Sequence, residues 1–148
     1  MALFGSAYFA KKYLSILIPL AALFASNLVL NNVVYAQYYD GFVWFTPQTM
    51  WVYGAMILVA VLGMGLLKKV TAGRIVVGAV AASMIFFLVT NMGSWLYDPI
   101  YTKDFSGLLQ SYTAGLLFLR NSLLGNLMFS GVLFGIYHVA TLKSLHTA

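Results

Sequence analysis

Two residue types are missing from this chain, and a third is scarce. There is no cysteine, which excludes disulfides and thiolate chemistry and leaves the redox compartment open. There is no glutamate, and the only acids are Asp40, Asp98 and Asp104. Neither a His-Glu-x-x-His motif nor a phosphate-binding Gly-x-x-x-x-Gly-Lys loop occurs. We therefore expect no enzyme activity, no metal site and no cofactor, and the chain cannot power ATP-driven transport by itself.

Charge as a whole is scarce, and apolar residues take its place. Only 7% of residues are charged, against about 25% in soluble proteins. The hydrophobic fraction is 62% and the mean hydropathy is +0.91, values typical of an integral membrane protein. The net charge of +5 does not indicate nucleic-acid binding here, because the basic residues lie between apolar runs and act as topology signals. We expect one transmembrane domain over residues 1–148, with the lipid bilayer as its first partner.

The apolar runs predict an all-α integral membrane protein, a polytopic helical bundle. Four full spans are expected at about 13–34, 48–67, 75–96 and 123–142. A helix at about 105–119 would be only about 22 Å long, so we expect it to be re-entrant or interfacial. Arg120, Asn121 and Ser122 would break the chain after it, with Ser122 as the N-cap of the last span. If the short helix crosses instead, there are five spans.

The first ten residues are apolar but too short to span, and they predict an N-terminal helix remnant whose beginning is missing. A signal peptide followed by cleavage near Ala36 is the competing interpretation. Asn27, Asn31 and Asn32 would interrupt its apolar core, and further spans follow, so we favour a retained first span.

Basic residues set the expected orientation through the positive-inside rule. With four spans, six of the eight basic residues lie on one side, which we expect to be cytoplasmic: Lys11, Lys12, Lys68, Lys69, Arg74 and Lys143. Lys103, Arg120 and all three acids fall on the outer side. Both termini would then be cytoplasmic. The five-span alternative keeps the count at six against two, so charge does not choose between them.

Polar side chains in and between the spans are the candidate binding residues. Asn27 and Asn31 share one helix face, and the topology gathers them with Asn91 and Asn121 towards the outer leaflet. Carboxamides donate and accept hydrogen bonds, which suits a neutral polar ligand. A charge at membrane depth is costly without a cavity or partner, which makes Arg120 a functional candidate. The predicted substrate-binding set is Asn27, Asn31, Asn91, Trp95, Tyr101, Tyr112, Arg120 and Asn121, with Trp95 and Tyr101 stacking on the ligand.

Three pieces of sequence carry a family resemblance. They are Ile18–Asn27 (IPLAALFASN), Phe86–Trp95 (FFLVTNMGSW) and Leu119–Asn126 (LRNSLLGN) with the Leu-Phe-Gly that follows at 133–135. Together they resemble an uncharacterised bacterial family of small integral-membrane proteins described as transport proteins. That family is similar to the substrate-binding S components of energy-coupling-factor (ECF) vitamin transporters. The family usually has Asp where this chain has Asn27 and Asn126, which puts a cationic ligand in doubt.

The resemblance implies a substrate-capture subunit in a bacterial cytoplasmic (inner) membrane, with a pocket that opens outward. It also implies an ECF-type energising module as partner, made of a transmembrane coupling protein and ATPases, and a small vitamin-like solute as substrate. The alternative is a structural or assembly subunit of a larger membrane complex that binds no ligand. Co-purifying partners would separate the two.

Overall fold

The computed structural model describes the backbone of residues 2–146 and the side chains of residues 2–142, which leaves the Lys143 side chain outside. Its α-helices are α1 (Ala2–Tyr8), α2 (Leu14–Val29), α3 (Pro47–Leu66), α4 (Ala72–Tyr97) and α5 (Phe105–His146). A π-helical turn, η1 (Leu30–Val34), extends α2, and a short 3-10 helix, η2 (Ala36–Tyr38), follows it. The part of the chain that is described contains no strand, so the predicted all-α class is confirmed.

Four helices are long and apolar enough to cross a membrane. They are Leu14–Val34, which joins α2 and η1, then Pro47–Leu66, Ala72–Tyr97 and Phe105–Leu142. Each of these helices has at least the roughly 20 residues that a bilayer core requires. The chain is therefore a helical membrane bundle with four candidate spans. The helix predicted before Lys11 is α1, which is too short to cross.

The last predicted boundary needs a correction. The expected break at Arg120–Ser122 is absent, and α5 continues without interruption from the predicted short helix into the predicted last span. Ser122 is therefore not an N-cap. Arginine, asparagine and serine cost well below about 1 kcal/mol each in a helix interior, too little to end a helix with apolar neighbours on both sides. The N-cap lies at Asp104, whose carboxylate accepts a hydrogen bond from the Gly107 N–H at 2.8 Å.

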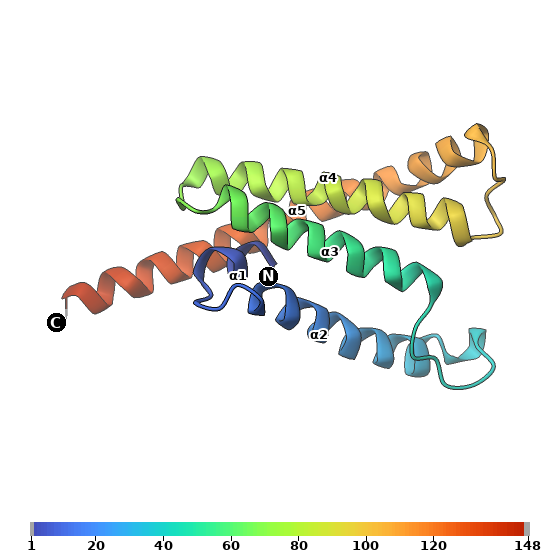
Figure 1. Ribbon diagram of the computed structural model, residues 1–148, viewed down its shortest axis with the longest axis horizontal. Helices are drawn as coiled ribbons and strands as arrows, with labels where there is room; N and C mark the ends of the chain where they lie inside the picture. Colours follow the sequence, from blue (N-terminus) through green and yellow to red (C-terminus); the bar gives the residue numbers. More distant parts are fainter. Residues whose placement is uncertain (1, 147–148) are drawn as a thin grey trace.

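The helices pack around α3 and α4. In Figure 1, α3 lies between α2 and α4, while α5 runs along α4 and continues beyond the bundle towards the C-terminus. α1 packs against α2 and α3. The α1–α2 and α3–α4 turns carry Lys11, Lys12, Lys68 and Lys69, and we call this the basic end. The α2–α3 and α4–α5 connections, which hold all three aspartates, form the acidic end.

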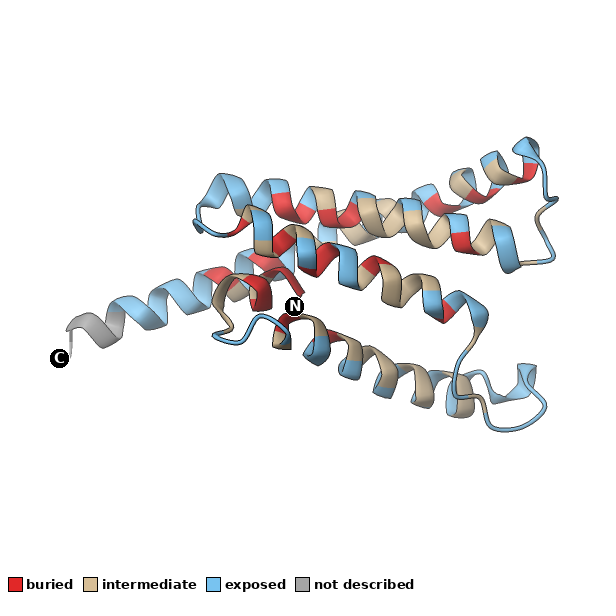
Figure 2. Ribbon diagram, in the orientation of Figure 1, coloured by how far each residue is buried: buried red, intermediate tan, exposed pale blue. Residues whose placement is uncertain are grey.

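Small side chains form most of the buried interior. Ala55, Ala60 and Ala79 are fully buried, and Figure 2 shows the buried positions concentrated where α1, α3 and α4 meet. Membrane helices gain little from apolar burial between them, because lipid is equally apolar, so close backbone approach through small residues is what stabilises their contacts. At Gly63 an added Cβ would lie 2.1 Å from Ser6 Oγ, which shows how closely α1 and α3 approach.

The start of α5 should be sensitive to acid. The Gly107 N–H and then the Thr102 hydroxyl, which donates at 2.7 Å, lower the pKa of Asp104. A lowered pKa stabilises the fold above the unfolded-state value, and this contribution disappears as the pH falls from about 4 through the lowered pKa. We expect Asp104→Ala to reduce the melting temperature at neutral pH and to have little effect in acid.

Circular dichroism melts of the detergent-solubilised protein at about pH 7 and about pH 3 would measure this difference. Asp40→Ala is the matched control, because the Asp40 carboxylate accepts no hydrogen bond within the described chain. Equal losses for both variants at neutral pH would show that the cap contributes nothing specific.

Candidate functional site

A polar cavity of about 470 Å³ lies near the acidic end, between α4, the first half of α5 and the start of α3. This volume is within the range of small-molecule sites, which is about 300–1,000 Å³. The apolar part of its wall is formed by Phe86, Phe87, Phe118 and Leu119. The polar lining residues are all uncharged: Gln48, Ser83, Thr90, Asn91, Ser94, Tyr101, Asn121 and Ser122. We call this feature the polar cavity.

The hydrogen bonds of the lining residues decide which of them can bind a ligand. Thr90 Oγ1 donates to Phe86 O at 2.7 Å, and Asn91 Nδ2 donates to Phe87 O at 2.8 Å. Gln48 Nε2 donates to Ser94 Oγ and so links α3 to α4. The side chains of Tyr101, Asn121 and Ser122 make no hydrogen bond with any described residue. These three, with the side-chain oxygen of Asn91, are available to a ligand.

Small residues bring α4 and α5 close together beside the cavity. An added Cβ at Gly115 would lie 2.2 Å from Asn91 Oδ1, so a larger residue there would displace the Asn91 carboxamide. One turn earlier, Ser111 Oγ donates to Asn91 O at 2.8 Å. Deeper in the bundle, Asn126 Nδ2 donates to Ser83 Oγ at 2.9 Å. These contacts fix the two helices that form most of the cavity wall.

The α4–α5 connection closes the acidic end of the cavity and is held by its own hydrogen bonds. Trp95 Nε1 donates to Thr102 O at 2.9 Å. Lys103 Nζ donates to Asp98 O at 2.9 Å and also to Trp95 O, which satisfies carbonyls left free at the end of α4. Asp98 Oδ1 accepts from the Ile100 N–H at 3.0 Å. Tyr101 is therefore presented from an ordered segment.

Three of the eight predicted site residues come together in the polar cavity, namely Asn91, Tyr101 and Asn121. Two others lie beside it without lining it. Trp95 anchors the connection through Thr102, and the Tyr112 hydroxyl donates to Leu88 O at 3.0 Å. The Trp95 ring is thus bonded to the α4–α5 connection through Thr102. Stacking of Trp95 and Tyr101 on a ligand stays a prediction.

The remaining predicted residues lie elsewhere. Asn27 on α2 and Asn31 on η1 are separated from α4 and α5 by α3. Arg120 is exposed on α5 and lines none of the cavities described. The expected gathering of four asparagines is thus limited to Asn91 and Asn121, because α2 packs against α1 and α3 rather than against α4 or α5.

Five polar residues that line the cavity are not in the predicted set: Gln48, Ser83, Thr90, Ser94 and Ser122. The available signal was the spacing of four between Thr90 and Ser94, which places both on one face with Asn91 beside them. Gln48 gave a weaker signal, since it occupies the first turn of α3 and thus the same end of the bundle as Ser94.

The fold and the site together define a polytopic helical membrane protein with an uncharged polar cavity near the acidic end of its bundle. The chain belongs to a family of unknown function (DUF6580), whose sequence profile matches residues 1–147. Comparison with curated proteins finds no similar sequence. Comparison with solved structures finds no similar chain.

Proposed function

We propose that this protein is the substrate-capture subunit of a membrane transporter and binds a small, neutral, vitamin-like solute in the polar cavity. The observation that carries the proposal is the uncharged polar lining of that cavity, with Tyr101 and Asn121 free to bind. Asn121 lies on the membrane helix α5, where polar groups usually pair with one another, so an unpaired one beside a cavity favours a ligand. Binding without catalysis is the activity that these residues support.

The ligand chemistry follows from the donors and acceptors. Carboxamide and phenol groups can each donate and accept, and they suit carbonyl, hydroxyl or ring-nitrogen groups on a solute. Phe86, Phe87 and Phe118 offer apolar surface for a flat ring. No charged side chain lines the cavity, so a strongly ionic substrate would lack a counter-charge.

Transport would need partners that this chain does not supply. We propose that an ECF-type energising module, a transmembrane coupling protein with ATPases, provides the energy. This agrees with the resemblance to S components and with the lack of a phosphate-binding loop. The resemblance implies a bacterial inner-membrane location, and the charge distribution favours an orientation with the basic end and both termini in the cytoplasm. The polar cavity would then lie near the outer surface.

A pull-down from the native membrane in mild detergent tests this function. The tagged protein would be isolated, and its co-purifying chains and small molecules would be identified by mass spectrometry. Recovery of a transmembrane coupling protein, ATPases and a small polar solute is the expected result. A complex without ATPases and without a retained solute would contradict the proposal.

Asn91→Leu is expected to remove the retained solute and leave the fold intact. Leucine has the branched shape of asparagine without its hydrogen-bonding groups, and the hydrogen bond lost is a local one to Phe87 O. Loss of one ligand hydrogen bond costs about 0.5–1.5 kcal/mol, or more where a polar ligand group stays unpaired. Asn27→Leu is the matched control, since Asn27 lies on α2 and does not line the cavity. Equal solute retention by the two variants would assign Asn91 a packing role.

One observation favours the alternative, a structural or assembly subunit. Arg120 lies on an exposed face of α5 between Leu116 and Leu124, which are 52% and 60% exposed. A charge among apolar side chains on a membrane helix calls for a pairing group on a neighbouring protein, or for a path to the membrane surface. Arg120→Gln that dissolves a solute-free complex would support this function.

A further inference from the structure

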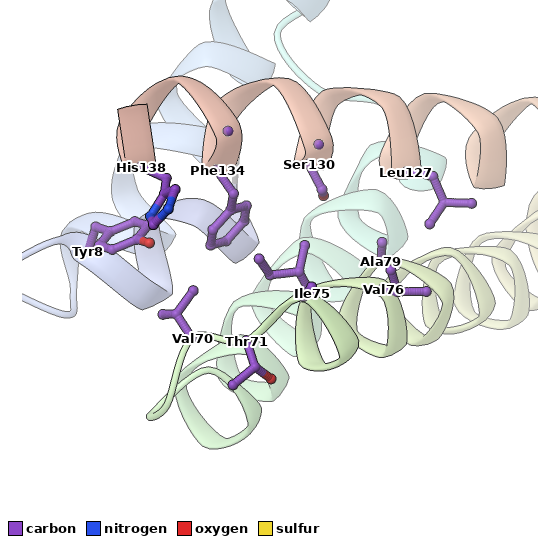
Figure 3. A pocket seen from close by; sticks show the side chains of 13 residues that line it. Tyr8, Val70, Thr71, Ile75, Val76, Ala79, Leu127, Ser130, Phe134 and His138 are labelled. Atoms are coloured by element: carbon purple, nitrogen blue, oxygen red, sulfur yellow. The ribbon is translucent and has the colours of Figure 1, made fainter. Parts of the chain in front are cut away.

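A second hollow lies at the basic end of the bundle, and we call it the basic-end groove. Its volume is about 490 Å³, and it runs between the first half of α4 and the second half of α5. Figure 3 shows Ile75, Val76 and Ala79 on α4 across from Leu127 and Phe134 on α5. Most of its lining is thus hydrocarbon. Such a groove beside lipid suits an acyl chain better than a polar solute.

Polar side chains also line the groove: Tyr8, Thr71, Ser130 and His138. Ser130 on α5 is only 9% exposed, yet its hydroxyl makes no hydrogen bond with any described residue. Figure 3 shows this hydroxyl pointing towards α4, into the groove. The hydroxyl faces the groove and can donate to a ligand that carries an acceptor at this depth.

The mouth of the groove is positively charged. It is lined by Val70, Thr71 and Ala72. Lys68 and Lys69 come directly before these residues, and their ammonium groups make no hydrogen bond within the described chain. Thr71 caps α4, so the positive end of a 26-residue helix lies at the same place. All three aspartates lie at the opposite end of the bundle. An anionic group at this mouth would therefore meet lysines and no acidic side chain of the described residues.

We propose that the basic-end groove binds one anionic glycerophospholipid. One acyl chain lies between α4 and α5 along Val76 and Leu127. An ester carbonyl accepts the Ser130 hydroxyl hydrogen bond, and the phosphate lies at the start of α4 near Lys68 and Lys69. This combination of apolar groove, buried donor and basic mouth matches the three parts of such a lipid in order. The proposal is independent of any ligand in the polar cavity.

Native mass spectrometry of the full chain in mild detergent tests the site. Phosphatidylglycerol and phosphatidylcholine with identical acyl chains are the probes. We expect one phosphatidylglycerol to be retained in preference to phosphatidylcholine. Val76→Trp, at a half-exposed groove position, should abolish retention by filling the groove. Val77→Trp is the matched control, because Val77 is similarly exposed but does not line the groove.

A charge variant keeps the test decisive if Val76→Trp does not fold. Lys68→Gln and Lys69→Gln should each lower the retention of phosphatidylglycerol roughly fivefold and leave phosphatidylcholine unchanged. Equal retention of the two lipids by the unaltered protein would overturn the proposal. So would equal loss in the Val76 and Val77 variants. A dimer in the same spectra that Val76→Trp dissociates would instead make the groove an interface between two copies, which also overturns it.

Discussion

Gly93→Ala is expected to destabilise the bundle by about 1–3 kcal/mol, the usual cost of overpacking a well-packed interior. Gly93 is buried on α4 against α3, and an added Cβ would lie 2.4 Å from Trp51 Cγ and 2.7 Å from Trp51 Cβ. Because the Trp51 Cβ is fixed to its backbone, a rotamer change cannot relieve the contact. The helices would have to separate, which disturbs the α3–α4 contact on which the bundle depends.

The measurement is reversible unfolding of the purified protein in mixed detergent micelles, followed by circular dichroism. Gly54→Ala is the matched control, because its added methyl group would meet no atom within 4 Å. Alanine is the better helix former by about 0.8–1.0 kcal/mol, so this control should be neutral or stabilising. A Gly93→Ala protein as stable as the control would mean that α3 and α4 lie further apart than described here.

A single cysteine introduced into the polar cavity should react with a maleimide much faster than one introduced on the lipid-facing surface. The chain has no cysteine of its own, so each introduced thiol is the only one. Asn121→Cys would place a thiol in the cavity lining, whereas Leu124→Cys, less than one turn away, would place it on an exposed face outside the cavity. Only the thiolate reacts, and it forms where water reaches the sulfur.

We therefore expect a membrane-impermeant maleimide to label Asn121→Cys at least about tenfold faster than Leu124→Cys in sealed membranes. Protection of Asn121→Cys by a retained solute would further support binding in the cavity. Similar rates for the two thiols would contradict a water-accessible cavity at Asn121. Melting temperatures close to that of the unaltered protein are the control that both variants fold.

Much of the fold follows from the sequence, because apolar length determines where membrane helices form. The predicted starts of three spans lie within about three residues of α2, α3 and α4. The N-cap of α4 at Thr71 and the end of α4 before Asp98-Pro99 also follow from local chemistry. The predicted helix end at Arg120 was wrong, because three successive polar residues do not end a helix that has apolar residues on both sides.

The site was harder to predict, because its members depend on which helices become neighbours. Helical spacing places Asn91 beside Thr90 and Ser94, but it cannot say that α5, rather than α2, packs against that face. Asn27 and Asn31 carry the same chemistry as Asn121 and differ only in helix partner. Nor does composition distinguish the exposed Arg120 from its cavity-lining neighbour, since about 100° of helical rotation separates them.

The uninterrupted course of α5 has a mechanical consequence. With 42 residues it is about 63 Å long, roughly twice the thickness of a bilayer core, and the polar cavity and the basic-end groove share it as a wall. No hinge divides Asn121 from Ser130. A tilt of α5 that narrows one hollow must therefore also move the wall of the other. A ligand in the polar cavity would change the shape of the basic-end groove, and a ligand in the groove would change the shape of the cavity.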